Sequence, residues 1–175
     1  MNFRGHLIGG AVSGLALVLP LAGFYQAQMP GGVGSSMHFK LLGTTLIFSL
    51  FPDLDIQSIP QRWFYRSILI LLLYLGYLEA YKLALFVSIV AILPLLSGHR
   101  GWTHRLWAPL FSPIFLAILY EYFMSQSRFF YKFSLQKAIH SVLLHKWFVF
   151  AACVGWFTHL CLDYLPKKLP KKIKI

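Results

Sequence analysis

The sequence predicts an all-α, polytopic integral membrane protein, a helical bundle with about five to six membrane segments. Hydrophobic residues make up 58% of the 175 residues, charged residues only 12%, and the formal net charge is +11. Such a chain has too few charges to cover a water-soluble surface, and its basic excess suits the flanks of membrane spans. We expect residues 1–175 to form a single membrane-embedded domain.

Apolar runs separated by polar or Gly/Pro-rich breaks define the candidate segments. They cover residues 7–27, 39–51, 67–78, 81–97, 108–124 and 145–164. Crossing a hydrocarbon core about 30 Å thick takes roughly 20 residues, so the 39–51 segment must extend into its flanks or dip into the membrane. The first segment lacks a small-x-small cleavage site, and we interpret it as a retained span rather than a signal peptide.

Residues 66–97 fit either one long helix or a hairpin that turns between Gly76 and Lys82, where Glu79 interrupts the apolar run. The hairpin is favoured, because six segments bring all the polar islands described below to one side of the membrane. One long helix would leave the island around His99 on the opposite side.

The basic residues support this arrangement, because the cytoplasmic flanks of membrane spans collect Lys and Arg. The side of the polar islands holds ten of the sixteen: Arg4, Arg62, Arg66, Arg100, Arg105, Lys167, Lys168, Lys171, Lys172 and Lys174. The other side holds Lys40, Lys82, Arg128, Lys132, Lys137 and Lys146. We therefore expect both termini and the polar islands on the cytoplasmic side, with the tail KKLPKKIKI near anionic headgroups.

Ionisable residues within membrane segments are energetically costly and are functional candidates by default. The island FPDLDI carries Asp53 and Asp55 directly after an apolar helix that Pro52 helps to stop. An extended turn there would aim both carboxylates in a similar direction. A solvated Asp-rich turn is the structural alternative.

The island THLCLDYL carries His159 and Asp163, four residues apart on a predicted helix. Their side chains share one helix face and could reach one cation or hydrogen-bond one another. A His and Asp pair that ties helices together is the alternative.

The island GHRGWTH carries His99 and His104, which are five residues apart. This spacing is poor for one helix face, but it works if the glycines form a turn before a helix starting near Thr103. A structural loop is the alternative. His6 gives the weakest signal, because a lone His at a membrane entrance is more often an interfacial residue.

Together these islands offer nitrogen and oxygen ligands that suit zinc, manganese or iron. The candidate ligands are His6, Asp53, Asp55, His99, His104, His159 and Asp163. The set exceeds what one tetrahedral zinc needs. We therefore expect one or two divalent ions, zinc first among them, that activate water for hydrolysis.

The order of the islands and the residues within them also resemble the motifs of a known family. The matching residues are Gly5-His6-Leu7, Pro52-Asp53-Leu54-Asp55 followed by Gln61-Arg62, Gly98-His99-Arg100-Gly101-Trp102-Thr103-His104, and His159-Leu160-Cys161-Leu162-Asp163. They resemble the YdjM-like family of bacterial inner-membrane proteins, a former domain of unknown function regarded as metal-dependent hydrolases. The resemblance covers nearly the whole chain.

The resemblance implies an all-helical protein of the bacterial inner membrane whose metal site uses the seven ligands named above. It also implies a distant similarity to zinc-dependent phospholipase C and P1-type nucleases. The chain departs from the family pattern at Ile56, where members often carry His, and at Arg105, where they often carry Ser. The first change removes a possible ligand, and the second adds a cation.

In the expected mechanism, one metal is held by His99, His104, His159 and Asp163, and His6 completes the ligand set. Asp53 and Asp55 orient the water or hold a second ion, and Arg100 stabilises developing charge. Arg62, Arg66 and Arg105 are expected to bind an anionic substrate, although the positive-inside rule alone would also place them there. The expected substrate is a phosphoester or other ester of a membrane lipid.

Two other classes of function remain possible from the sequence. One is a cation or proton transporter, but the segments 7–27, 67–78 and 108–119 contain almost no polar residues to line a path. The other is a metal-stabilised scaffold that binds anionic lipid through its basic face. Nucleic acid is not an expected partner, because no recognition helix or RNA-binding motif is present. The sequence does not indicate an oligomeric state.

Overall fold

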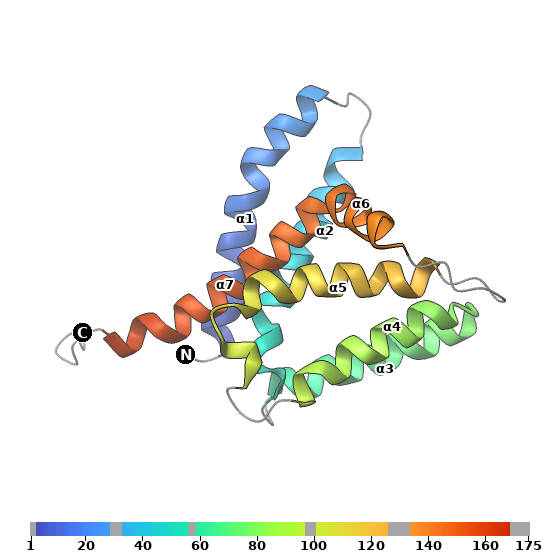
Figure 1. Ribbon diagram of the computed structural model, residues 1–175. Helices are drawn as coiled ribbons and strands as arrows, with labels where there is room; N and C mark the ends of the chain where they lie inside the picture. Colours follow the sequence, from blue (N-terminus) through green and yellow to red (C-terminus); the bar gives the residue numbers. More distant parts are fainter. Residues whose placement is uncertain (1–2, 29–32, 56–58, 97–100, 126–133, 169–175) are drawn as a thin grey trace. The chain divides into compact units, whose positions relative to one another are not determined.

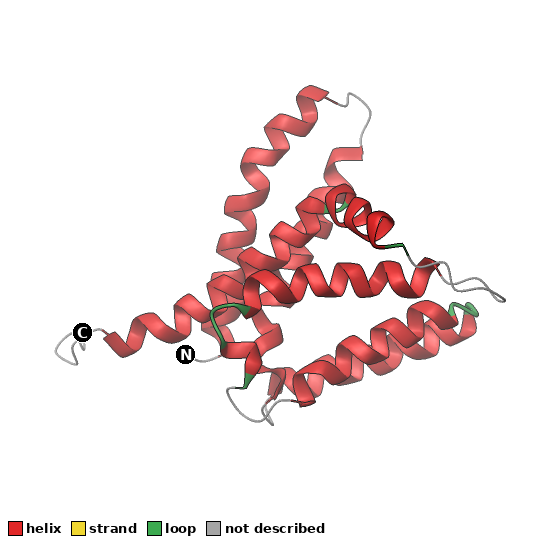
Figure 2. Ribbon diagram, viewed as in Figure 1, coloured by secondary structure: helices red, strands yellow, loops and turns green. Residues whose placement is uncertain are grey.

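The computed structural model describes residues 3–28, 33–55, 59–96, 101–125 and 134–168 (Figure 1). Within these ranges the chain forms seven α-helices and three short 3-10 helices (Figure 2). The predicted all-α fold is confirmed. The chain divides into two compact units, which are described separately.

Unit 1 comprises Met1–Pro52 and Phe150–Ile175. It contains α1 (Phe3–Gln28), α2 (Val33–Leu50) and most of α7 (Lys146–Lys168). The segments predicted at 7–27, 39–51 and 145–164 correspond to these helices. The predicted segment 39–51 is extended at its N-terminal side, so α2 spans 18 residues.

Small residues allow the three helices of unit 1 to approach closely. A Cβ atom at Gly10 of α1 would collide with the Ser49 hydroxyl of α2, and one at Gly9 would collide with Leu162 of α7. A Cβ atom at Gly155 of α7 would collide with the backbone carbonyl of Thr45 in α2. The absence of side chains at these positions brings the first turns of α1 against both partner helices.

The centre of unit 1 is an aromatic cluster between α2 and α7. The Trp156 ring lies 5.2 Å from the Phe51 ring and 6.0 Å from the Phe48 ring, measured between centroids. Trp156 is fully buried and Phe51 nearly so. Phe51 begins the 3-10 helix η1 (Phe51–Asp55), so this packing fixes the end of α2 against α7 immediately before Asp53.

Gly155→Ala is expected to lower the stability of unit 1 by about 1–3 kcal/mol, because a backbone carbonyl cannot move aside as a side chain can. Gly43→Ala is the matched control, since a Cβ atom at Gly43 meets nothing within 4 Å. In the control the higher helix propensity of Ala should raise stability by up to about 1 kcal/mol. Thermal unfolding in detergent measures both. Equal midpoints for the two variants would contradict the close crossing.

Unit 2 comprises Asp53–Val149. Its elements are α3 (Ile59–Tyr77), α4 (Tyr81–Ile92), η2 (Leu93–Leu96), η3 (Trp102–His104), α5 (Ala108–Ser125) and α6 (Leu135–Leu144). Figure 1 shows α3 and α4 side by side, with α5 alongside α4. The Phe86 ring of α4 packs edge-on against Tyr120 of α5, with 5.4 Å between centroids.

Residues 66–96 form the predicted hairpin. α3 ends at Tyr77 and α4 begins at Tyr81, and the Tyr65 hydroxyl donates a hydrogen bond of 2.8 Å to the Ala91 carbonyl across the pair. Glu79 lies in the turn with a φ of 56°, a left-handed conformation that non-glycine residues rarely adopt. The turn therefore falls where the charged residue interrupts the apolar run.

The segment predicted at 108–124 corresponds to α5, whereas the helix start near Thr103 considered for the third island is not an α-helix start. Residues 102–104 form a single 3-10 turn, Arg105 is extended, and α5 begins only at Ala108. Pro109 lies in the first turn of α5. A backbone N–H in the first turn has no partner within the helix, so the N–H that proline lacks costs no hydrogen bond there. This proline explains why the helix begins after the third island.

Within the described residues, two helices are long and apolar enough to cross a membrane by length and composition. They are α5 and the Lys146–Tyr164 part of α7, and Tyr81–Leu96 is a shorter apolar helix. The number of membrane segments, expected to be about five to six, stays a prediction.

Candidate metal centre

Two histidines and one carboxylate of unit 1 lie together at the packed ends of α1 and α7. Asp163 lies between the two imidazoles: its Oδ1 is 3.3 Å from Nε2 of His6, and its Oδ2 is 3.7 Å from Nε2 of His159. The two rings are stacked, with 4.0 Å between centroids and 21° between planes. Both imidazoles are fully buried, whereas 17% of the Asp163 side chain remains accessible.

The helices explain this arrangement. His159 and Asp163 are one turn apart on α7, so both side chains lie on the same helix face. His6 comes from α1, whose close approach to α7 depends on Gly9. The shared face of His159 and Asp163 predicted from their spacing is confirmed. His6, the weakest candidate in the sequence, lies in direct contact with both.

The backbone of α2 orients His159. Nδ1 of His159 lies 2.9 Å from the carbonyl oxygen of Ser49. Because a carbonyl oxygen only accepts hydrogen bonds, we assign the proton to Nδ1. In the neutral ring Nε2 then carries a lone pair, and this lone pair faces the Asp163 carboxylate. A histidine that donates from one ring nitrogen to a carbonyl and presents the other to a cation is the usual arrangement of a metal ligand.

Ser49 was not singled out from the sequence. Its hydroxyl donates to the Leu46 carbonyl at 2.8 Å and lies 3.3 Å from the His6 carbonyl, and the residue is fully buried. The group that orients His159 is a backbone carbonyl, which any residue possesses, so no residue type marks it. The burial of Ser49 is the only signal that the sequence could offer, because Ser49 follows Thr45 by four residues and Leu41 by eight and so shares their face of α2.

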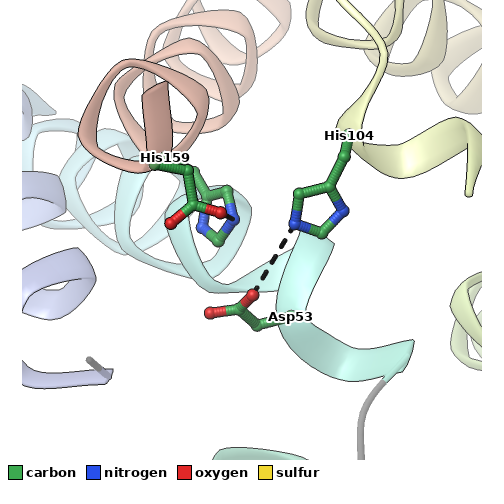
Figure 3. A group of neighbouring side chains, drawn as sticks. Asp53, His104 and His159 are labelled. Carbon is green, nitrogen blue, oxygen red and sulfur yellow. Dashed lines mark ion pairs between the residues drawn. The ribbon is translucent and has the colours of Figure 1, made fainter. Parts of the chain in front are cut away.

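Unit 2 contributes a second pair of candidate ligands. Nε2 of His104 lies 3.8 Å from Oδ1 of Asp53, an ion pair marked by the dashed line in Figure 3. Asp53 comes from η1 and His104 from η3, and 22% of the Asp53 side chain is accessible, against 9% for His104. The pair therefore combines a buried imidazole with a carboxylate that water can reach.

Two hydrogen bonds hold the elements that carry this pair. The buried Thr103 hydroxyl lies 3.2 Å from Nδ1 of His104, which fixes the ring and leaves Nε2 toward Asp53. The Gln61 amide of α3 donates to the Leu54 carbonyl of η1 at 3.0 Å. Thr103 and Gln61 occur within the sequence motifs, but neither was predicted to support the site.

The remaining predicted site residues divide into two groups. Arg62, Arg66 and Arg105 are exposed on unit 2. Asp55 ends η1, and its side chain lies outside the described part of the structure, as do His99 and Arg100.

Each unit thus offers Asp and His side chains that could hold a metal ion: His159 and Asp163 in unit 1, and Asp53 and His104 in unit 2. The donors are nitrogen and oxygen atoms, which suit zinc and other divalent ions of the first transition series. His6 is a further imidazole beside Asp163.

Comparison with known proteins gives one family match. A family model described as YdjM inner membrane protein matches residues 1–169. No curated protein matches the chain, and no solved structure matches it.

Proposed function

Because the chain belongs to the YdjM family of inner membrane proteins, we propose that it is a membrane-bound, metal-dependent hydrolase. Membership of this family implies association with a lipid bilayer. The proposal combines that location with the candidate ligands on helices α1 and α7 and on η1 and η3. The observation that carries it is the environment of His159.

In that environment the lone pair on Nε2 of His159 faces the Asp163 carboxylate at 3.7 Å. Two electron-pair donors at this distance repel one another unless a cation or a proton lies between them. His6 adds a second imidazole nitrogen 3.3 Å from the same carboxylate. A divalent cation satisfies all three groups at once, and two imidazoles with one carboxylate are a common ligand set for zinc and iron.

We propose that Asp53 and His104 complete the coordination of one ion with His159 and Asp163. Chain connectivity supports this. Asp53 follows Phe51 by two residues within one 3-10 helix, and Phe51 packs on Trp156, one turn before His159 on α7. His6, Asp55 and His99 are proposed to complete the shell or to hold a second ion. Zinc is the expected metal, with manganese or iron as alternatives.

When bound, such an ion lowers the pKa of a coordinated water and supplies a hydroxide at neutral pH. A carboxylate oxygen of Asp53 that does not bind the ion would be suited to accept a proton from that water or to orient it, because the side chain is partly accessible and lies beside His104. Arg100 is proposed to stabilise the negative charge that develops during ester hydrolysis.

The proposed topology is a single polytopic domain of about five to six membrane segments in the bacterial inner membrane. The α3–α4 hairpin supports it, because a hairpin returns the chain to the side of Asp53 before the third island begins. The bias of ten of sixteen basic residues to that side supports cytoplasmic termini and a cytoplasmic site.

Hydrolysis by the purified chain in phospholipid nanodiscs tests the proposal, with a chromogenic phosphodiester and the nanodisc phospholipids as substrates. We expect turnover that requires added zinc, manganese or iron and that a chelator abolishes. Asp163→Asn should lower the rate at least about a hundredfold. Glu121→Gln changes a carboxylate on α5, outside the candidate ligands, and should leave the rate unchanged. Stoichiometric metal without turnover on either ester would contradict the hydrolase and leave a metal-stabilised scaffold.

A further inference from the structure

Three elements meet at the end of unit 2 that carries Asp53 and His104. The first turn of α3 is tied to η1 by the hydrogen bond from Gln61 to Leu54. The same η1 is tied to η3 by the ion pair between Asp53 and His104. The start of α3 and the loop that leads from η3 into α5 therefore lie at one end of the unit.

Exposed arginine and tryptophan side chains gather at this end. On α3 the Trp63 side chain is 64% exposed, and the guanidinium of Arg66 lies 5.9 Å from the centre of its ring. Before α5, Trp107 is 49% exposed and stacks on Trp102 with 6.3 Å between centroids. With the exposed guanidinium groups they form what we call the arginine–tryptophan rim, which comprises Arg62, Trp63, Arg66, Arg105 and Trp107.

The arginines of the rim add positive charge to the exposed surface of unit 2. None of its arginines forms an ion pair within the part of the chain that the structure describes. The whole sequence has only five acidic residues against sixteen basic ones. An anionic partner outside the protein is therefore the natural counter-charge for three exposed guanidinium groups at one end of unit 2.

Beyond the rim both helices become apolar on their exposed faces. α3 exposes Leu69, Ile70 and Leu73, each more than half accessible. α5 exposes Leu110, Phe111 and Phe115, and among the described helices it is one of two that are long and apolar enough to cross a membrane. Along each of these two helices the exposed surface thus changes from arginine and tryptophan to largely apolar side chains.

We propose that the arginine–tryptophan rim lies in the headgroup layer of the bilayer and that its arginines bind phosphates of anionic phospholipids. Tryptophan is enriched at membrane interfaces because its ring is apolar while its N–H needs a polar partner. Arginine binds phosphate through paired N–H donors while its stem covers apolar surface. Asp53 and His104 would then lie at the depth of the lipid phosphates. The inference rests on the bilayer association of the family and not on the proposed hydrolysis.

Retention of lipid by the detergent-purified full chain tests the rim. We expect the wild type to bind phosphatidylglycerol in preference to phosphatidylcholine when native mass spectrometry follows a titration with each. Arg62→Gln/Arg66→Gln/Arg105→Gln should lower the affinity for phosphatidylglycerol at least about tenfold. The control Lys40→Gln/Lys82→Gln/Lys137→Gln removes the same charge elsewhere and should change it less than about twofold.

Three results would overturn the proposal: no preference in the wild type, an equal loss in both triple variants, or full competition by free inorganic phosphate. The last would assign the arginines to a soluble anion instead of a lipid. Asp163→Asn, designed to weaken metal binding, should retain the lipid preference. The rim can therefore stand if the hydrolase fails, and the hydrolase can stand if the rim fails.

The depth of the rim gives a second test that needs no change in charge. Spin labels are placed at Trp63→Cys, Leu73→Cys, Trp107→Cys and Phe115→Cys in a Cys153→Ala/Cys161→Ala background reconstituted in vesicles. Collision with oxygen relative to a water-soluble nickel chelate should be low at 63 and 107 and several-fold higher at 73 and 115. The same ratio at all four positions would contradict the placement.

Discussion

Asp163→Asn is expected to lower the affinity for a divalent metal at least about a hundredfold while the fold is retained. Asp163 is the residue that both buried imidazoles of unit 1 approach, at 3.3 Å from His6 and 3.7 Å from His159. Changes in groups that merely orient a metal ligand already cost tenfold to a hundredfold, so loss of a ligand should cost more. Asn has almost the same shape as Asp, and so the packing between α1 and α7 should survive.

Metal affinity is measured by competition with a chromogenic chelator, and folding by circular dichroism. Glu121→Gln provides the control for loss of a carboxylate outside the cluster. Unchanged affinity in Asp163→Asn would show that the two imidazoles and the carboxylate form a hydrogen-bonded network with a protonated histidine. Such a network would fit the scaffold or the proton-transporting protein considered from the sequence.

The second large effect concerns the losses of metal affinity caused by changing Asp53 and Asp163, which should not add in the double variant. If both carboxylates bind the same ion, Asp53→Asn alone should lower the affinity about a hundredfold, and the double variant should lose far less than the product of the two single effects. The reason is that removal of one carboxylate already breaks the four-ligand site, so that removal of the second carboxylate has little binding energy left to lose.

The stoichiometry separates one ion from two. One shared ion gives one metal per chain in the wild type and strong coupling in the double-mutant cycle. Two separate ions would give two metals in the wild type, one in each single variant, and additive losses. Two metals and additive losses would contradict the shared ion, but they would still support one metal bound by each pair of ligands.

The parts of the site that follow from local geometry could be predicted from the sequence. His159 and Asp163 share a face because four residues make about one helical turn. The hairpin of α3 and α4 turns at Glu79 because a charged residue between two apolar runs favours a polar turn. Both features depend on residues close together in the chain.

The features that depend on packing between distant helices could not be predicted. His6 joins Asp163 only because Gly9 and Gly155 allow α1, α2 and α7 to approach closely. Ser49 orients His159 through a backbone carbonyl, which leaves no mark in the choice of residue. In each case the deciding contact joins segments more than forty residues apart.

The third island shows how one residue can override a reasonable local interpretation. A turn at the two glycines would have allowed a helix to begin near Thr103, but α5 begins at Ala108, where the apolar run predicted a segment and where Pro109 suits the first turn. His104 is consequently carried by a separate 3-10 turn. This turn, and not a helix, presents its imidazole to Asp53.

Elemental analysis of the detergent-purified protein, prepared without chelators, tests the metal centre most directly. The wild type is compared with His159→Ala/Asp163→Ala and with a control, His140→Ala/Glu121→Ala, that removes one His and one carboxylate elsewhere. The account predicts stoichiometric zinc, manganese or iron in the wild type and the control, and its loss from the His159/Asp163 variant. A wild type without metal, or a folded His159/Asp163 variant that retains its full complement, would contradict it.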